Sequence, residues 1–242
     1  SLNAPLAQEF QNLFQGEIAN NPDLAALVLT GEGKQAFSAG GDFDFLLARS
    51  EDTPYNNAKI MSRFYNYFLS SMLRLNNGVQ PVPIISAVNG SAIGAGLCIA
   101  MGTDIRIVES NAKLGLTFVN LGLTPGMGST HFATELLGHQ IASYMLLTGD
   151  IINGNRAREL GLALEAVEGS DNVKQRALDI AKKIASNPSQ SCVKTTLQSM
   201  RMELLERLEQ RLAREADSQA QAYASVELKN QVLAMQKKTS KQ

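Results

Sequence analysis

The stretch PIISAVNGSAIGAGLCIAMGTD, residues 83–104, decides the fold. Residues 84–88 form an apolar run that ends at Asn89-Gly90, which is typical of a strand buried on both faces. Residues 91–101 are small or apolar and uncharged, and they predict a closely packed helix with Gly94 and Gly96 at its start. A buried strand that turns through glycine into a helix leaves unpaired backbone N–H groups, which can hold a developing negative charge. The sequence therefore predicts a site at this turn.

A second glycine turn lies earlier in the chain. Residues 24–30 (LAALVLT) and 36–38 are predicted as short strands, and Ala39-Gly40-Gly41-Asp42 follows them directly. Asp42 is predicted to cap a helix that runs through Leu47. If both glycine turns face one pocket, a backbone N–H from each can stabilise a carbonyl oxygen as it becomes an enolate or a tetrahedral oxyanion.

The remaining chain predicts an α/β core followed by helices alone. Apolar periodicity predicts helices at 5–20, 58–75, 129–137, 139–147 and 153–160, strands at 105–108 and 162–167, and loops at 51–57 and 121–128. From residue 173 the predicted elements are helices at 173–185, 189–201 and 202–235. The chain thus divides into a core at 1–186 and a helical region at 187–242.

One leucine stripe in the helical region has two interpretations. Leu204, Leu205, Leu208 and Leu212 are bordered by Glu and Arg, as in a helix that packs on a partner. The same stripe fits a helix that covers its own domain. The prediction tested below is that this stripe forms a subunit interface.

Composition excludes several classes of function. The 242 residues are 44% hydrophobic with a formal net charge of −1, so neither a nucleic-acid partner nor a membrane partner is expected. Cys98 and Cys192 form no CxxC pair, which argues against a disulfide framework or a metal site and favours an intracellular, reducing compartment.

The glycine turn at 94–96 has two other interpretations besides an oxyanion site. A Rossmann-type dinucleotide site, as in a nucleotide-dependent oxidoreductase, uses a strand, a glycine turn and a helix, but here Ile99 stands where the third glycine or alanine belongs. Alternatively, the glycines serve only close packing between the helix and the strand.

Several motifs in the same order resemble the crotonase superfamily, the enoyl-CoA hydratase/isomerase family. They are LNAPL at 2–6, AFSAGGDF at 36–43, PIISAVNGSAIGAG at 83–96, LGLTPGMGST at 121–130 and LLTGDIINGNRARELGLALEAV at 146–167. The resemblance implies a crotonase-like (ClpP/crotonase) spiral of ββα units with a C-terminal helical region that assembles a homotrimer or homohexamer. It also implies that the chain lacks strands that the family carries before the position of Leu2.

The same resemblance implies an acyl-CoA ligand, with coenzyme A as part of the substrate and no other cofactor. The oxyanion-hole N–H groups fall on Gly41 and Ala95. The implied substrate-binding residues are Leu2, Ala4, Ala39, Gly40, Gly41, Asp42, Phe43, Gly94, Ala95 and Asn120. For Asn120 the residue itself leaves two roles open, binding a polar acyl group or a water, and holding the loop backbone.

The departures from the family bear on the reaction. The two glutamates of the family's hydratases fall on Cys98 and Phe118, and the acidic residue of its isomerases falls on Gly126. Cys98 is either a nucleophile or a packed thiol, and His131 is a base only if its helix turn points inward. Three hypotheses remain: an enzyme that relies mainly on the oxyanion hole, a catalytically weak acyl-CoA-binding or scaffold protein, and, more remotely, the oxidoreductase.

Overall fold

Two four-stranded sheets form the centre of the computed structural model. The structure describes residues 1–73 and 81–239. The first sheet has the order β1 (Leu27–Thr30), β3 (Ile84–Val88), β5 (Ile105–Glu109) and β8 (Glu165–Val167), and all its pairs are parallel. The second has the order β2 (Ala36–Ser38), β4 (Ser91–Ile93), β6 (Leu114–Gly115) and β7 (Ile151–Ile152), and only its β6–β7 pair is antiparallel. The chain passes repeatedly from the first sheet to the second and then into a helix, which confirms the predicted spiral of ββα units.

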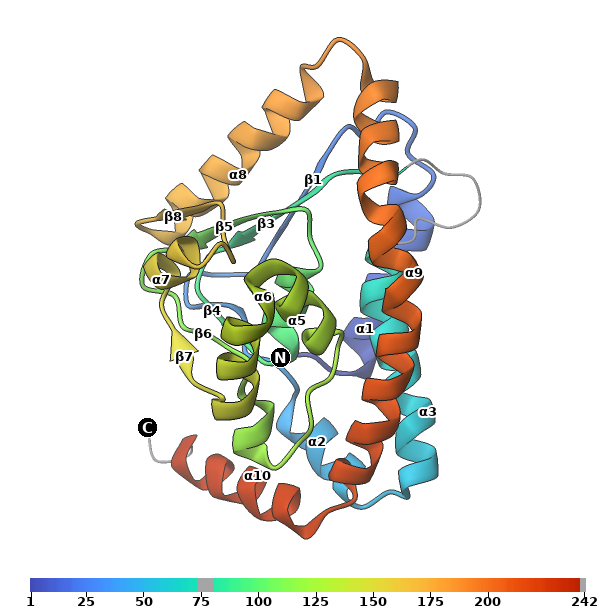
Figure 1. Ribbon diagram of the computed structural model, residues 1–242, viewed down its shortest axis with the longest axis vertical. Coiled ribbons are helices and arrows are strands. Elements are labelled where there is room, and N and C mark those ends of the chain that lie inside the picture. The colour runs from blue at the N-terminus through green and yellow to red at the C-terminus, as the bar shows by residue number, and fades with distance from the viewer. Residues whose placement is uncertain (74–80, 240–242) are drawn as a thin grey trace.

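Helices surround these sheets. The α-helices are α1 (Ala4–Leu13), α2 (Phe43–Ser50), α3 (Pro54–Tyr65), α4 (Ser71–Leu73), α5 (Ala95–Met101), α6 (Ser129–Thr148), α7 (Gly154–Glu159), α8 (Ser170–Ala185), α9 (Gln190–Tyr223) and α10 (Val226–Thr239), with π-helical turns at Phe14–Ile18 and Asn66–Ser70 and a 3-10 turn at Thr117–Leu121. In Figure 1, α8 lies against the first sheet, α9 runs the length of the molecule beside α3, and α10 crosses its lower end. The end of the helix predicted at 58–75 lies outside the described residues.

Strand β3 is apolar throughout because both of its faces are buried. Ile85 and Ala87 pack with Ile107 against Val173 and Ala177 of α8. Ile84 and Val88, which alternate with them, join the main core on the other face of the sheet. The prediction of a doubly buried strand is therefore confirmed.

The region after β3 differs from the prediction in one respect that matters for function. Residues 91–93 form β4 and pair with β2 and β6, so the helix predicted over 91–101 begins only at Ala95. The strand that enters the glycine turn at Gly94 is therefore β4 of the second sheet and not β3, and the oxidoreductase hypothesis stays untested. In this chain a strand of the other sheet stands between β3 and α5.

Two further helix boundaries differ from those predicted from the sequence. The loop predicted at 51–57 is partly helix, because Thr53 caps α3 at Pro54. The predicted break between residues 201 and 202 is absent, since no glycine or proline interrupts α9 before its end at Tyr223. Gly138, with φ 71°, does interrupt α6, in agreement with the two helices predicted there.

The leucine stripe of α9 covers its own chain. Leu208 and Leu212 are 3% and 5% exposed and belong to the same hydrophobic core as the sheets. Leu204 and Leu205 pack against the edge of that core. The stripe prediction was therefore wrong for Leu208 and Leu212, because both are already buried within one chain. The division at residue 187 and the assembly into trimers stay predictions.

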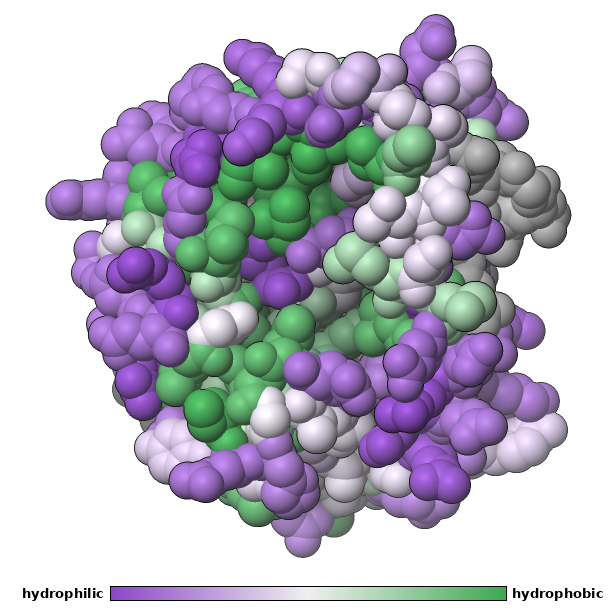
Figure 2. Space-filling model, turned by 45° about the horizontal axis from the view of Figure 1, so that its top comes forward, coloured by the Kyte–Doolittle hydropathy of each residue, from purple (hydrophilic) through white to green (hydrophobic). Residues whose placement is uncertain are grey.

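An apolar groove lies between the first sheet and the start of α9. Pro83, Ile105, Val193, Leu197 and Met200 are among the residues that line its volume of about 520 Å³. Figure 2 shows, on the face that it presents, a hollow with an apolar floor and a polar rim.

No helix in the described part of the chain is long and apolar enough to cross a membrane.

A buried ion pair fixes α9 to the sheets. Arg201 donates from Nε to Asp104 Oδ1 at 3.0 Å and from Nη2 to Asp104 Oδ2 at 2.5 Å. Asp104 Oδ2 also accepts the N–H of Ile84, the first residue of β3, at 2.7 Å. The Arg201 side chain is only 4% exposed, so its charge depends on this one carboxylate.

We expect the change Asp104→Ala to lower the free energy of unfolding by about 3–5 kcal/mol, because it leaves the buried Arg201 charge uncompensated. Glu203→Ala is the matched control. It removes an exposed ion pair with Arg207 on the same helix and should cost about 0.5 kcal/mol or less. Urea unfolding measures both, and equal losses would show that the Arg201 pair does not anchor α9.

Candidate active site

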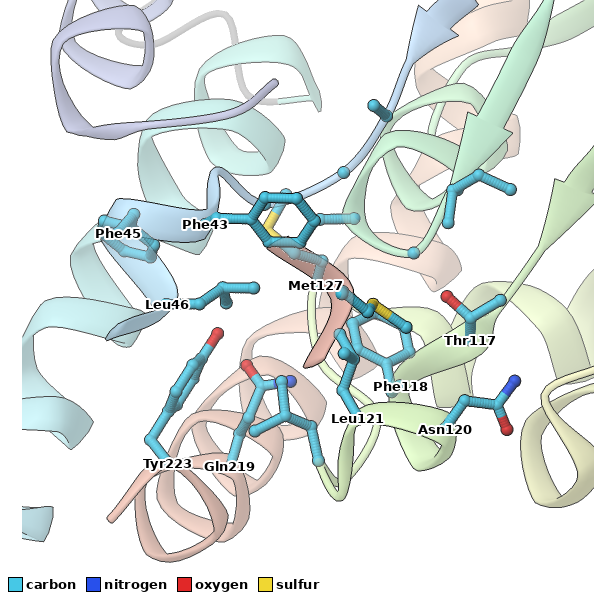
Figure 3. A pocket seen from close by; sticks show the side chains of 18 of the residues that line it. Phe43, Phe45, Leu46, Thr117, Phe118, Asn120, Leu121, Met127, Gln219 and Tyr223 are labelled. Carbon is cyan, nitrogen blue, oxygen red and sulfur yellow. The ribbon is translucent and has the colours of Figure 1, made fainter. Parts of the chain in front are cut away.

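The two glycine turns share the wall of a pocket of about 410 Å³ (Figure 3). Most of its wall is apolar, with side chains from α2, α3, the 3-10 turn and the end of α9. The lining residues include Ala39, Gly40, Gly41, Phe43, Phe45, Leu46, Gly94, Ala95, Thr117, Phe118, Asn120, Leu121, Met127, Gln219 and Tyr223. The sequence-based prediction that both turns face one pocket is consistent with this lining.

Backbone pairing orients the peptide of Gly41. Leu2 donates its N–H to Gly40 O at 2.7 Å and accepts the N–H of Asp42 at 2.9 Å. This pattern is a parallel bridge between Leu2 and Gly41. It uses the carbonyl group of Gly40 and the N–H group of Asp42, which are the two neighbours of Gly41. The N–H of Gly41 itself therefore faces away from Leu2.

The second candidate N–H begins a helix. Ala95 is the first residue of α5, so its N–H has no partner within the helix. The preceding Gly94 has φ 53° and ψ −122°, a conformation that side-chain-bearing residues rarely adopt. This glycine lets the chain leave β4 and turn at once into α5.

The predicted substrate-binding residues divide into two groups. Ala39, Gly40, Gly41, Phe43, Gly94, Ala95 and Asn120 line the pocket, whereas Leu2, Ala4 and Asp42 do not. Leu2 instead pairs with the first glycine turn, and Asp42 caps α2 by accepting the N–H groups of Asp44 and Phe45. The cap confirms the role that the sequence predicts for Asp42.

Cys98 does not line the pocket. Its side chain is fully buried, and the thiol contacts Gly126 O at 3.6 Å. Burial raises the pKa of Cys98 well above its usual value, and the nearby Glu215 adds to the effect. This environment is that of a packed thiol and not of a reactive thiolate.

Phe118 and Asn120 both come from the 3-10 turn. Phe118 is 7% exposed and presents its ring to the pocket (Figure 3). Asn120 donates from Nδ2 to Gly149 O at 3.0 Å. Asn120 therefore holds the loop backbone while it also lines the pocket.

The space beside Gly126, where the resemblance implies the isomerase carboxylate, is occupied by other groups. A Cβ atom on Gly126 would meet the Tyr65 hydroxyl and would lie 2.6 Å from Gln219 Nε2. Tyr65 donates to Gln219 Oε1, and Gln219 Nε2 donates to Thr124 O at 2.8 Å. An acidic side chain at residue 126 has no room unless this pair moves.

A buried glutamate ties the same loop to α9. Glu215 accepts the N–H of Gly128 at 2.6 Å and that of Thr130 at 2.9 Å, at the start of α6. Burial nevertheless raises the pKa of Glu215. Glu215, Gln219 and Tyr223 recur every fourth residue on one face of α9, a polar stripe that the sequence reasoning missed. Their spacing was the available signal.

No carboxylate, imidazole or thiol occurs among the described residues that line the pocket. His131 is 2% exposed and lies in the first turn of α6, away from this wall. Burial lowers the pKa of His131. Its helix turn points inward, but toward Leu204 and Arg207 of α9 and not toward the pocket, and its ring lies beside Phe132. The described residues contain no cluster of three or more side chains that could hold a metal ion.

The chain is similar to known proteins in both sequence and fold. A family model described as enoyl-CoA hydratase/isomerase matches residues 1–241. The short-chain-enoyl-CoA hydratase of Clostridium acetobutylicum is 32% identical over 97% of this chain and 85% of its own length. A solved enoyl-CoA hydratase/isomerase of Mycobacterium paratuberculosis has a TM-score of 0.85 and 29% identity, over 97% of this chain and 89% of that one. Pseudomonas aeruginosa OdaA has a TM-score of 0.82 and 28% identity, with the same coverage of both chains.

We expect Gly126→Ala to lower the free energy of unfolding by about 1–3 kcal/mol, because the added methyl group displaces the Tyr65–Gln219 pair. Gly16→Ala is the control, since a Cβ there meets nothing within 4 Å. In its helical setting this control should be neutral or stabilising by up to about 1 kcal/mol. Chemical denaturation compares the two, and a neutral Gly126→Ala would contradict the close packing at this loop.

Proposed function

The chain belongs to the enoyl-CoA hydratase/isomerase family and is a hydratase/isomerase-like enzyme; we propose that it binds an acyl-CoA thioester in this pocket and stabilises the thioester enolate with two backbone N–H groups. These are the N–H groups of Gly41 and Ala95. The observation that carries the proposal is the presence of both residues on the wall of one pocket. The parallel bridge to Leu2 does not use the N–H group of Gly41. The N–H group of Ala95 has no partner within α5, because Ala95 is the first residue of that helix.

The apolar wall strengthens such a device. Backbone dipoles that are fixed before the reaction stabilise developing charge best where water is excluded. Phe43, Phe118 and Met127 supply such surroundings beside the glycine turns. The positive end of α5 adds to the effect of the Ala95 N–H group.

The proposed reaction needs no positioned carboxylate. Hydration requires a base that activates water and an acid that protonates the α carbon. Cys98 and Phe118, at the positions of the hydratase glutamates, supply neither. Reactions that form the enolate without a base, such as decarboxylation of an acyl-CoA, suit this wall better.

A catalytically weak acyl-CoA-binding protein is the second candidate. The observation that favours it is the lack of titratable acids and bases among the described lining residues, apart from Tyr223 and Lys113. In both cases coenzyme A arrives as part of the ligand, without a further cofactor. Residues 2–4 and 39–43 are proposed to lie along the coenzyme A part of the ligand.

The proposal also includes assembly as a homotrimer or homohexamer. It places the protein in a reducing compartment, because both cysteines are free thiols.

Ala95→Pro tests the oxyanion hole. Proline is well tolerated at the first position of a helix, and its ring carbon Cδ replaces the amide hydrogen in question. Acetoacetyl-CoA is the probe, because its enolate is chromophoric. We expect the variant to bind this enolate about 10- to 100-fold more weakly than the parent, as the loss of a hydrogen bond to a charged group predicts.

Ala95→Ser keeps the N–H and is the control, which should bind the enolate within about twofold of the parent. Circular dichroism establishes that both variants are folded. Equal enolate binding by the parent, Ala95→Pro and Ala95→Ser would remove Ala95 from the proposed mechanism.

Hydration of crotonyl-CoA by the parent should be close to background. Each missing acid or base group typically lowers the rate by about 10²–10⁴, and the oxyanion hole does not replace it. The measurement follows the loss of enoyl absorbance in the parent, Cys98→Glu, Phe118→Glu and the double variant. We expect Cys98→Glu to be unstable, because its carboxylate would be buried in the core.

A parent rate typical of enzymes, about 10 per second or more, would show that other residues perform the acid and base steps. Phe118→Glu serves as the folded comparison. By itself it should leave the rate near background, since hydration needs a second positioned group.

A further inference from the structure

The Tyr223 side chain brings a hydroxyl group to an otherwise apolar part of the pocket. In Figure 3 it extends from α9 toward Leu46, with Gln219 beside it. The residue is 4% exposed and belongs to the main hydrophobic core. Within residues 1–73 and 81–239, no hydrogen bond is formed by its hydroxyl.

Its neighbours on α9 and α3 differ in this respect. The Tyr65 hydroxyl is bonded to Gln219, and Gln219 is bonded in turn to Thr124 O. The Tyr223 hydroxyl is not among the buried polar atoms that lack a partner, so it is open to the pocket, where water or a ligand atom can accept its hydrogen bond. A polar group that the fold leaves unpaired and directs into a pocket points to a ligand atom as its partner.

The charges around the pocket restrict what that atom is. Among the lining residues that the structure describes, Lys113 alone is charged, and it is exposed at the rim. Arg49, whose charge acts on Tyr223, does not line the pocket and is paired with Asp52 at 2.8 Å. A carboxylate beside the Tyr223 hydroxyl would thus be desolvated without a counterion, whereas a neutral oxygen there would not be penalised in this way.

The protonation state of Tyr223 defines its role. Burial raises the pKa of Tyr223, so the hydroxyl stays protonated at neutral pH. It is therefore available as a hydrogen-bond donor and is unsuited to act as a base.

We infer that Tyr223 determines specificity by donating a hydrogen bond to a neutral oxygen, such as a ketone, carried by an otherwise apolar acyl chain. The inference rests on the proposed acyl-CoA binding and adds the class of acyl group. The apolar side chains of Phe45, Leu46 and Phe64 accommodate the chain, and the hydroxyl of Tyr223 selects its oxygen.

Tyr223→Phe tests the inference, because it removes one oxygen and keeps the ring. Isothermal titration compares octanoyl-CoA with a set of analogues that each carry one ketone beyond the β carbon. We expect at least one ketone analogue to bind about tenfold more weakly to the variant than to the parent. Octanoyl-CoA should bind both proteins within about twofold.

Stability supplies a second readout. Tyr223→Phe should unfold at about the same urea concentration as the parent, because the hydroxyl that it removes forms no hydrogen bond with the described protein residues. Tyr65→Phe, the matched control, should unfold at a lower concentration, because it breaks the bond to Gln219.

The outcomes separate the two levels of the proposal. If octanoyl-CoA binds but no ketone analogue distinguishes Tyr223→Phe from the parent, the inference is overturned and acyl-CoA binding stands. A loss of stability in Tyr223→Phe equal to that of Tyr65→Phe also overturns it. If the parent binds no acyl-CoA at all, the proposed function fails and this inference fails with it.

Discussion

Direct backbone contact between the two glycine turns is the constraint on which the site depends. A Cβ atom on Gly40 would lie 2.7 Å from Ile93 O, and one on Gly96 would lie 2.6 Å from Ser38 O. No side chain larger than hydrogen fits at either point, so β2 and the β4–α5 turn approach more closely than side chains would allow. Because the turns touch in this way, Gly41 and Ala95 lie on one pocket wall although they are far apart in the sequence.

The parts of the fold that local pattern determines could be predicted from the sequence. The buried strand at 84–88, the cap at Asp42 and the break at Gly138 each depend on a few neighbouring residues. β4 could not be predicted, because its three residues are strand only through pairing with β2 and β6. The pocket residues of α9 were missed for a similar reason. Gln219 and Tyr223 look like ordinary helix-surface residues until α3 and the loop after residue 121 cover them.

Helix α9 is as much a part of the pocket as the glycine turns are. Glu215 bonds to the N-terminus of α6, and Gln219 joins Tyr65 to the loop at Thr124. These contacts occupy the space beside Gly126, so the shape of the loop is set by α9 and not by the loop residues alone. A sequence comparison that ends at the glycine motifs therefore omits residues that line this pocket, Gln219 and Tyr223.

Burial affects dipoles and ionisable groups in opposite ways at this site. The pKa values of Cys98, Tyr65 and Tyr223 are all raised by burial, which keeps these groups neutral. The same low dielectric strengthens the interaction of a fixed backbone N–H group with an oxyanion, since no water competes for it. A pocket built in this way favours stabilisation of charge on the substrate over proton transfer by its own side chains. The absence of carboxylates at Cys98, Phe118 and Gly126 agrees with the apolar character of the pocket wall.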